Sequence, residues 1–214
     1  MRAAHSVFFT RRQLILAGAA PLIAGCGGIQ LLPTPMQPQL YLLRPDIVAP
    51  AGAPVQWRLS VGTPDASASL DTERIALSRS ATTMDYFANA AWPDRLPAIL
   101  QRLLVQSFDA SNRIVAVARD TTGVENDYVL ETEIRDFEAR YGDPNAAPQI
   151  LVSIQAKLAR MPQREIIASL NVRQQAQASE NMLDAIVIAF NQATAAAIAQ
   201  IADWTLKAPS PVPA

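Results

Sequence analysis

The residue whose type and position suggest chemistry most directly is Cys26, the only cysteine in the chain. It ends the run Leu22-Ile23-Ala24-Gly25-Cys26, in which an aliphatic residue and small residues precede the cysteine. This is the pattern of a lipobox, where a signal peptidase cuts before the cysteine and the cysteine carries acyl chains such as palmitate. The run predicts that the mature protein begins at Cys26 and is held on a membrane by lipid.

Residues 1–25 have the layout of an export signal. Arg2, Arg11 and Arg12 form a positive segment without acidic residues, and residues 14–24 are apolar but too few to span a bilayer as a helix. The alternative is an ordinary secretory signal followed by an incidental cysteine, but the spacing of the small residues favours lipidation. The run Thr10-Arg11-Arg12-Gln13-Leu14-Ile15 also resembles a twin-arginine signal, so the Sec and twin-arginine routes both stay open.

Other catalytic residue types are scarce after the signal. The only histidine, His5, lies within it, so the mature chain has no histidine and, once acylated, no free thiol. Ser-His-Asp and Cys-His catalysis and the usual zinc sites are thereby excluded. A Ser-Lys site needs a desolvated lysine, and the only lysines, Lys157 and Lys207, have no motif around them. The hydroxyl-rich stretch of Ser78, Ser80, Thr82 and Thr83 is therefore not expected to form a catalytic site. For the protein as a whole, we expect no enzyme activity and no cofactor.

Two carboxylates, Glu131 and Glu133, lie two residues apart on a predicted strand and so share a face. Paired carboxylates can serve acid–base catalysis when their environments differ. Here they alternate with a set of core-facing residues, which predicts that the carboxylates occupy the solvated face; the core-facing set is Tyr128, Leu130, Thr132 and Ile134. Asp136 and Glu138 are interpreted in the same way.

Three aromatic residues, Tyr86, Phe87 and Trp92, precede the first predicted helix. The simpler interpretation is packing in the core or against the start of the helix. The alternative is an exposed surface for a partner or a lipid, since aromatic side chains also line binding sites.

The charge of the mature chain argues against several classes of partner. The signal carries three of the 18 basic residues and none of the 19 acidic ones, so 15 and 19 remain and the formal net charge is −4. A mildly acidic protein has no electrostatic footprint for nucleic acid, and its scattered basic residues form no patch for anionic lipid. No segment after the signal is expected to cross a membrane, which leaves the lipid as the predicted attachment.

The mature chain divides into a tether, one domain and a tail. Residues 26–38 are rich in glycine and proline and predict a lipidated tether that spans about 40 Å when extended. Residues 39–207 form one domain, which without disulfides depends on its apolar core, and residues 208–214 read as a disordered tail. Alternating patterns predict strands at 39–44, 55–61, 74–79, 84–88, 113–118, 127–141, 150–158 and 165–174.

The strand predicted at 127–141 changes its pattern midway. Its apolar parity passes from the face of Tyr128 to that of Phe137, Ala139 and Tyr141, which requires an inserted residue and predicts a β-bulge near Arg135-Asp136. Turns at 142–145 and 160–164 then make the last three strands an antiparallel meander. Its inward residues are predicted to be Ile150, Val152, Ile154, Ala156 and Leu158, then Ile166, Ala168, Leu170 and Val172.

Two segments have helical period, at 94–109 and at 182–206. Asp94 and Asn181 are the predicted N-caps, with Pro97 in the first turn of one helix and Asp184 near the positive end of the other. The pattern predicts an α/β sandwich of the α+β kind: a mostly antiparallel sheet with two helices packed on one face.

The lipobox and tether are followed by short pieces in a fixed order: Tyr41-Leu42-Leu43, Arg74-Ile75, Tyr86-Phe87, Trp92-Pro93-Asp94-Arg95-Leu96-Pro97, Asp127-Tyr128-Val129-Leu130, Phe137-Glu138-Ala139, and Ala189-Phe190-Asn191-Gln192-Ala193 with Trp204. This order resembles that of the ABC-type transport auxiliary lipoproteins, which accompany MCE-type lipid-transport systems of Gram-negative envelopes. The resemblance covers nearly the whole mature chain, with departures at 63–72, where the strand pattern blurs, and at 85–91.

The resemblance implies a non-enzymatic component that assists movement of lipid or another hydrophobic substrate across the envelope. Its implied partners are a permease, an ATPase and an MCE-domain protein encoded elsewhere; this chain has no GxxxxGK[ST] loop and is not the ATPase. Gly27 stands where an aspartate would favour inner-membrane retention, so the outer membrane and its periplasmic side are expected. The alternative is a structural or assembly lipoprotein that supports an outer-membrane complex or forms a homo-oligomer.

Overall fold

The computed structural model describes residues 37–120 and 125–209, so the predicted signal, the lipobox and most of the tether lie outside the described residues. The described chain forms, in order, β1 (Gln39–Leu40), β2 (Val55–Val61), β3 (Asp65–Ala66), β4 (Arg74–Ser80), β5 (Thr83–Ala91), α1 (Leu96–Ser111), β6 (Ile114–Arg119), β7 (Tyr128–Arg140), β8 (Gln149–Arg160), β9 (Glu165–Gln177) and α2 (Leu183–Thr205).

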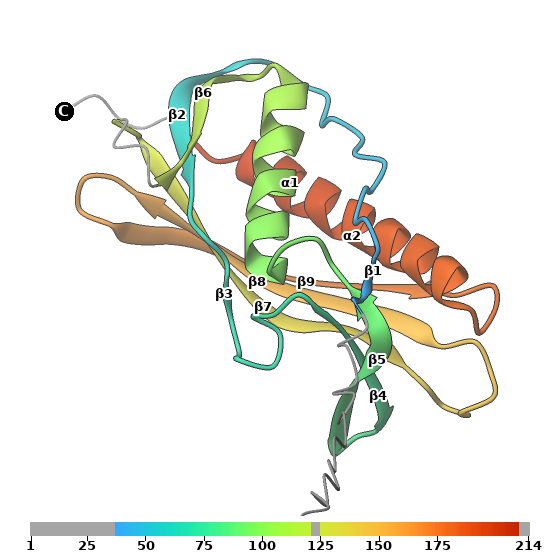
Figure 1. Cartoon of the computed structure of the whole chain (residues 1–214). Helices are drawn as coiled ribbons and strands as arrows, with labels where there is room; N and C mark the ends of the chain where they lie inside the picture. The colour runs from blue at the N-terminus through green and yellow to red at the C-terminus, as the bar shows by residue number, and fades with distance from the viewer. Residues whose placement is uncertain (1–36, 121–124, 210–214) are drawn as a thin grey trace, which may run out of the picture. The chain divides into compact units, whose positions relative to one another are not determined.

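The sheet is organised around the long strand β7 (Figure 1). One edge of β7 pairs with β8 in antiparallel fashion along its whole length, and β8 pairs likewise with β9. The other edge takes β2, β3 and β4 one after another, all parallel to β7. β6 extends the sheet from β2, and β5 and then β1 extend it from β4. The sheet is thus mixed but mostly antiparallel, and the predicted α+β class and meander are confirmed.

Some strand limits differ from the sequence prediction. The strand expected at 39–44 is only β1, because after Leu40 the chain leaves the sheet and runs past both helices, as Figure 1 shows. We call residues 41–54 the crossing segment. β5 runs through the whole ambiguous stretch to Ala91, and β3 was not predicted because two residues carry no periodic pattern.

The β-bulge predicted in β7 is present. Ile134 pairs with Ile154 and Asp136 pairs with Ser153, so Arg135 is the inserted residue. The insertion lets both Ile134 and Phe137 face the core, where both are buried.

A second bulge, in β9, makes one prediction wrong. Ile166 pairs with Ala159 and Ala168 pairs with Leu158, which leaves Ile167 as the extra residue. The side chain packed against the core is therefore that of Ile167, and Ile166 is 49% exposed instead of facing inward. The two neighbouring isoleucines satisfy either parity, so alternation alone gave the wrong one.

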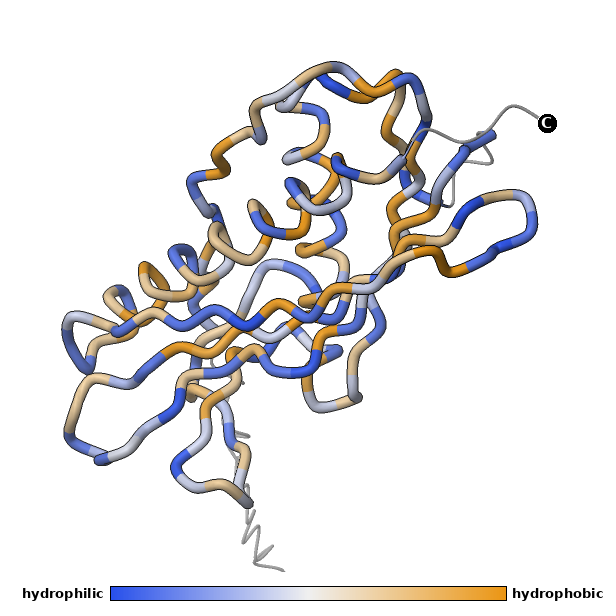
Figure 2. The backbone as a smooth tube through the Cα atoms, turned by 180° about the vertical axis from the view of Figure 1, so that it is seen from behind, coloured by the Kyte–Doolittle hydropathy of each residue, from blue (hydrophilic) through white to orange (hydrophobic). Residues whose placement is uncertain are grey.

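Both helices cover the same face of the sheet, as predicted (Figure 1). α2 packs along β8 and β9, and α1 packs on β6 and against α2. The view from behind in Figure 2 shows hydrophobic and hydrophilic residues interleaved along the strands, as expected of a sheet with one covered face.

Neither predicted N-cap is correct. α1 begins after Arg95, and the carboxylate of Asp94 instead accepts the Arg95 N–H at 2.7 Å. α2 begins after Met182, and the side chain of Asn181 is engaged elsewhere: it accepts from the Tyr141 hydroxyl at 2.9 Å and donates to the Pro144 carbonyl at 3.3 Å. Pro97 does lie in the first turn of α1, and Asp184 in that of α2.

Helix α2 is long and apolar enough to cross a membrane by length and composition alone, contrary to the sequence expectation. More than half of its most apolar stretch is buried within the fold, where Phe190, Ala197 and Ile201 are inaccessible to solvent. Its apolar character is therefore accounted for by packing on the sheet.

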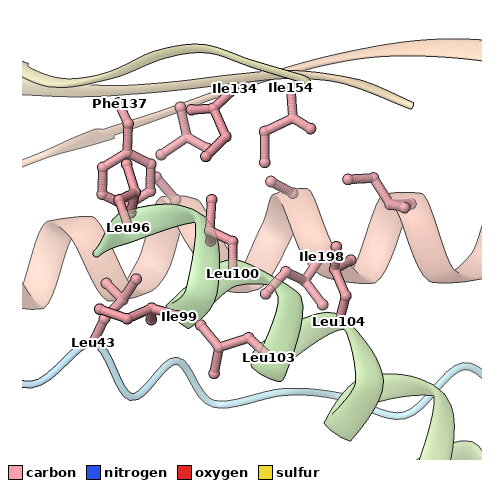
Figure 3. Packing of buried hydrophobic residues seen from close by; sticks show 14 of the residues in the cluster. Leu43, Leu96, Ile99, Leu100, Leu103, Leu104, Ile134, Phe137, Ile154 and Ile198 are labelled. Carbon is pink, nitrogen blue, oxygen red and sulfur yellow. The ribbon is translucent and has the colours of Figure 1, made fainter. Parts of the chain in front are cut away.

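The core lies between the sheet, the two helices and the crossing segment. Figure 3 shows Leu96, Leu100 and Leu104 of α1 among side chains of the sheet and α2, while Ile99 and Leu103 point toward Leu43 of the crossing segment. α1 is thus enclosed on two sides, which explains its wide buried stripe.

Three aromatic side chains form the centre of this core. Phe137 of β7 stacks on Phe190 of α2, with ring centroids 5.1 Å apart and planes inclined by 20°. Trp92 meets both rings edge-on, at 5.5 Å from Phe190 and 6.3 Å from Phe137. We call Trp92, Phe137 and Phe190 the aromatic cluster; it joins the end of β5, the middle of the sheet and α2.

The aromatic cluster predicts a large stability loss for Phe190→Ala. Truncation should lower the free energy of unfolding by about 3–5 kcal/mol, because it removes a fully buried ring and leaves a cavity beneath Trp92. Ile188→Ala, on the same helix but 58% exposed, is the matched control and should change it by less than about 0.5 kcal/mol. Urea unfolding of the two variants measures the difference, and equal losses would contradict the packing described.

Some buried hydroxyls within the described residues lack a hydrogen-bond partner, among them that of Thr194 in α2. Thr194→Val keeps the side-chain shape and should raise the free energy of unfolding by about 1 kcal/mol, because it removes the cost of an unpaired buried hydroxyl. In the control Thr205→Val, a buried hydroxyl that donates to the Ile201 carbonyl at 2.8 Å is lost, so stability should fall. Chemical denaturation separates the two; a loss for both variants would mean that Thr194 is paired in solution.

Candidate functional site

The predicted acylation site, Cys26, lies outside the described residues and stays a prediction. What the structure does describe is the point where the tether joins the domain. Gln39 and Leu40 pair with Ala90 and Ala91 of β5, and the Tyr41 N–H donates to the Ala91 carbonyl at 2.8 Å. The chain therefore enters the domain as an edge strand of the sheet.

The crossing segment fixes this entry point to the helical layer. Leu43 is buried in the core, and the Arg44 N–H donates to the side-chain oxygen of Asn191 in α2 at 2.6 Å. A groove of about 400 Å³ lies beside it and is lined by residues of the crossing segment and of α1, including Leu42, Ile47 and Arg102. The sequence analysis named Asn191 only as part of a short piece of the family resemblance and did not predict this hydrogen bond.

Trp92 does not belong to a partner surface, because it is 1% exposed within the aromatic cluster. The three aromatic residues considered as a possible surface are thus not brought together at the surface. The interpretation as core is the one the structure supports for Trp92.

Tyr86 is half-buried and braces the β4–β5 hairpin. Its hydroxyl donates to the Ser69 carbonyl at 3.0 Å, and the Arg74 guanidinium lies 3.6 Å from the centre of its ring. A cation at that position is attracted by the face of the ring. Tyr86 therefore ties the hairpin to the loop before β4, a contact that sequence spacing could not show.

Phe87 lies where β5 bulges, because Tyr86 pairs with Ala76 whereas Ala91 pairs with Arg74. It is half-buried and lines an open pocket of about 660 Å³ with Pro38, Asn89 and Arg95, beside the entry of the tether. Of the three predicted aromatics, Phe87 is the one placed beside a surface hollow, and its role there stays a proposal.

The carboxylates of the outer sheet face are paired with arginines. Glu131 accepts from Arg164 at 2.7 Å, and Glu133 lies 3.6 Å from Arg135. Such partly exposed pairs contribute little to stability, and opposite charges neutralise one another locally. This is the ordinary solvated face predicted for the Glu131 and Glu133 pair.

Glu138 corrects the prediction of a solvated position, since its side chain is buried. It accepts from Arg140 Nε at 2.7 Å, and Arg140 also donates to Asp136 at 3.0 Å. The arginine compensates the buried carboxylate, which alternation along the strand could not reveal.

The hydroxyl-rich stretch forms the β4–β5 turn. Ser80 Oγ lies 2.7 Å from Thr83 Oγ1 and 3.4 Å from Thr82 Oγ1, all exposed. Lys207 is paired with Asp203 at 2.6 Å at the far end of α2. These contacts join neighbouring residues and assemble no reactive pair from the hydroxyls and this lysine.

Two tyrosines, Tyr128 and Tyr141, have raised pKa values. Burial raises the pKa of Tyr128, with Arg160 opposing and Asp127 adding to the shift, and its hydroxyl donates to the Pro209 carbonyl at 2.6 Å. Burial also raises the pKa of Tyr141, against the effect of Arg79. Both phenols stay protonated donors at neutral pH, which suits structural contacts.

Solved structures with the same fold include a Xanthomonas campestris protein of the DUF330 family. It is 26% identical to this chain, with a TM-score of 0.73, and the match covers 78% of this chain and 94% of the other. An uncharacterized protein is 17% identical, with a TM-score of 0.62 and coverage of 79% and 99%. Comparison with curated proteins gives no match.

The model of a protein family, described as the ABC-type transport auxiliary lipoprotein component, matches residues 41–202. The matched region runs from the crossing segment nearly to the end of α2 and includes the whole aromatic cluster. Three of the short pieces that carried the sequence resemblance therefore meet in the core, through Trp92, Phe137 and Phe190. The chain belongs to the ABC-type transport auxiliary lipoprotein family.

Proposed function

We propose that this protein is an outer-membrane-anchored periplasmic lipoprotein that serves an MCE-type transporter of lipid or another hydrophobic substrate. The coarser part follows from the family, whose members are lipoprotein components of ABC-type transport and are not described as enzymes. The observation that carries the proposal is the family match beginning at residue 41, directly after a lipobox and a proline-rich tether.

The geometry of the tether junction supports a role in placement. The pairing of β1 with β5 and the bond from Arg44 to Asn191 tie the attachment point to both layers of the fold. A domain attached in this way is held near a membrane as a rigid unit, where it can dock to membrane-bound transport proteins.

Co-purification tests the partners. Mild-detergent extraction of envelopes with a C-terminally tagged wild-type chain should recover a permease, an ATPase and an MCE-domain protein. A Cys26→Ala variant should incorporate no labelled palmitate and recover less of these proteins, because its domain is displaced from its membrane; Gly28→Ala, which leaves the lipobox intact, is the control. Recovery of outer-membrane assembly proteins without any transport component would favour the structural-lipoprotein alternative and contradict the transport role.

Membrane choice is tested at the residue after the cysteine. Gly27→Asp should move the lipidated protein from outer- to inner-membrane fractions on a density gradient, whereas the control Gly27→Ser should stay with the outer membrane. Both variants should keep the same acylated mass. A wild-type protein found in the inner-membrane fraction would contradict outer-membrane sorting and leave the lipidation itself standing.

A further inference from the structure

The groove between the crossing segment and α1 combines an apolar floor with cationic walls; we call it the α1 groove. Its floor is formed by Leu43, Ile99 and Leu103, each at most 5% exposed. Figure 3 shows Ile99 and Leu103 pointing from α1 toward Leu43. Two arginines, Arg44 and Arg102, also line the groove. An apolar floor beside cations is complementary to an amphiphile, whose chain and headgroup need different surroundings.

The sequence of α1 places donors and apolar side chains on one stripe of the helix. Four residues that line the α1 groove are spaced i, i+3, i+4 and i+7, namely Ile99, Arg102, Leu103 and Gln106. Ile99 and Leu103 are buried, whereas Arg102 is half-buried and Gln106 is exposed. The helix therefore offers hydrogen-bond donors directly beside an apolar surface.

The crossing segment supplies the second cation. The backbone N–H of Arg44 is held by Asn191, whereas its exposed guanidinium has no ion pair or hydrogen bond within the described residues. The Arg102 guanidinium lies 3.9 Å from the carboxylate of Asp94, which is beyond hydrogen-bonding distance. Among the described residues that line the groove none is acidic, so its two positive charges are available to an anion. The sequence shows these arginines only as scattered basic residues, because they are 58 positions apart.

A single acyl chain with a carboxylate suits the α1 groove best. The volume of about 400 Å³ is near the lower end of the range for small-molecule sites, about 300–1,000 Å³, which favours one chain over the two of a phospholipid. A guanidinium can bind a carboxylate through two parallel N–H···O bonds, and such charge-assisted bonds are stronger than neutral ones. We propose that the α1 groove binds a long-chain fatty acid, with its chain on the apolar floor and its carboxylate held by Arg44 and Arg102.

Photo-cross-linking tests the site. The lipidated full chain, in micelles of an uncharged detergent, is irradiated with a fatty acid that carries a diazirine on its chain. Mass spectrometry of the peptides then locates the cross-links, which should fall on residues 42–47 and 99–106. Cross-links spread over other surfaces, or none in these two segments, would overturn the site.

A charge-neutralising variant tests the role of the two arginines. Arg44→Gln combined with Arg102→Gln should lower the cross-link yield in the groove severalfold, because the cations are lost while the backbone N–H of residue 44 remains. The matched control, Arg135→Gln combined with Arg164→Gln, removes two partly exposed cations that pair with carboxylates of the outer sheet face. Its yield should equal that of the wild type. An equal loss in both double variants would contradict a specific role for Arg44 and Arg102.

Ligands with the same chain separate the headgroup from the chain. A diazirine-bearing alcohol lacks the carboxylate, so its yield should be lower and the same in the wild type and the groove variant. Unlabelled fatty acid should displace the probe at a lower concentration than lysophosphatidic acid does. Equal labelling by the alcohol would overturn recognition of an anion, and stronger competition by lysophosphatidic acid would overturn the choice of a carboxylate over a phosphate.

Failure of this site and failure of the proposed function give different results. As part of a route for hydrophobic substrate, the site rests on the proposed function, whereas binding itself depends only on the groove. Cross-links in the groove without any transport component in the co-purification would support the fatty-acid site and contradict the transport role. Recovery of transport components without cross-links in the groove would overturn the site alone.

Discussion

The stacking of Phe137 on Phe190, closed by Trp92, is the contact on which the rest of the structure depends. It joins the central strand to the helix that covers the sheet. Because Trp92 stands between β5 and α1, it also fixes where the first helix starts. The entry of the tether is set by the same contact, since β1 pairs with Ala90 and Ala91, directly before Trp92. The packing of the core therefore also determines where the tether enters the domain.

The sequence patterns were most informative where one face of a strand is buried and the other is not. From Tyr128 to Leu158 the alternation revealed the strands, their meander and the bulge at Arg135, because any shift of register would expose the apolar set. The bulge at Ile167 was missed, since Ile166 and Ile167 fit either parity. The cap predicted at Asn181 was wrong, since its side chain bonds to Tyr141 and Pro144, and the cap predicted at Asp94 was wrong by one residue.

Among the candidate site residues, too, some could be interpreted from the sequence and others could not. Cys26 can be interpreted from the sequence because a peptidase reads a short linear pattern, independent of the fold. The fates of Tyr86, Phe87 and Trp92 depend on contacts with distant residues, such as Arg74 and Phe190, which spacing does not reveal. Glu138 has the parity of a solvated residue and is nevertheless buried beside Arg140. Burial of a charge depends on its partner, and partners across a strand pattern are a tertiary property.

The contacts of residues 39–44 also determine how the domain responds to a pulling force at its N-terminal side. β1 has only two paired residues, so backbone pairing alone would fray easily. Behind it along the chain lie two further contacts, the burial of Leu43 and the hydrogen bond from Arg44 to Asn191, which is next to Phe190 in α2. A pull from the N-terminal side therefore reaches the helical layer only after the sheet edge has opened. Two contacts of different kinds, one in the core and one to α2, thus keep the start of the crossing segment in place if β1 frays.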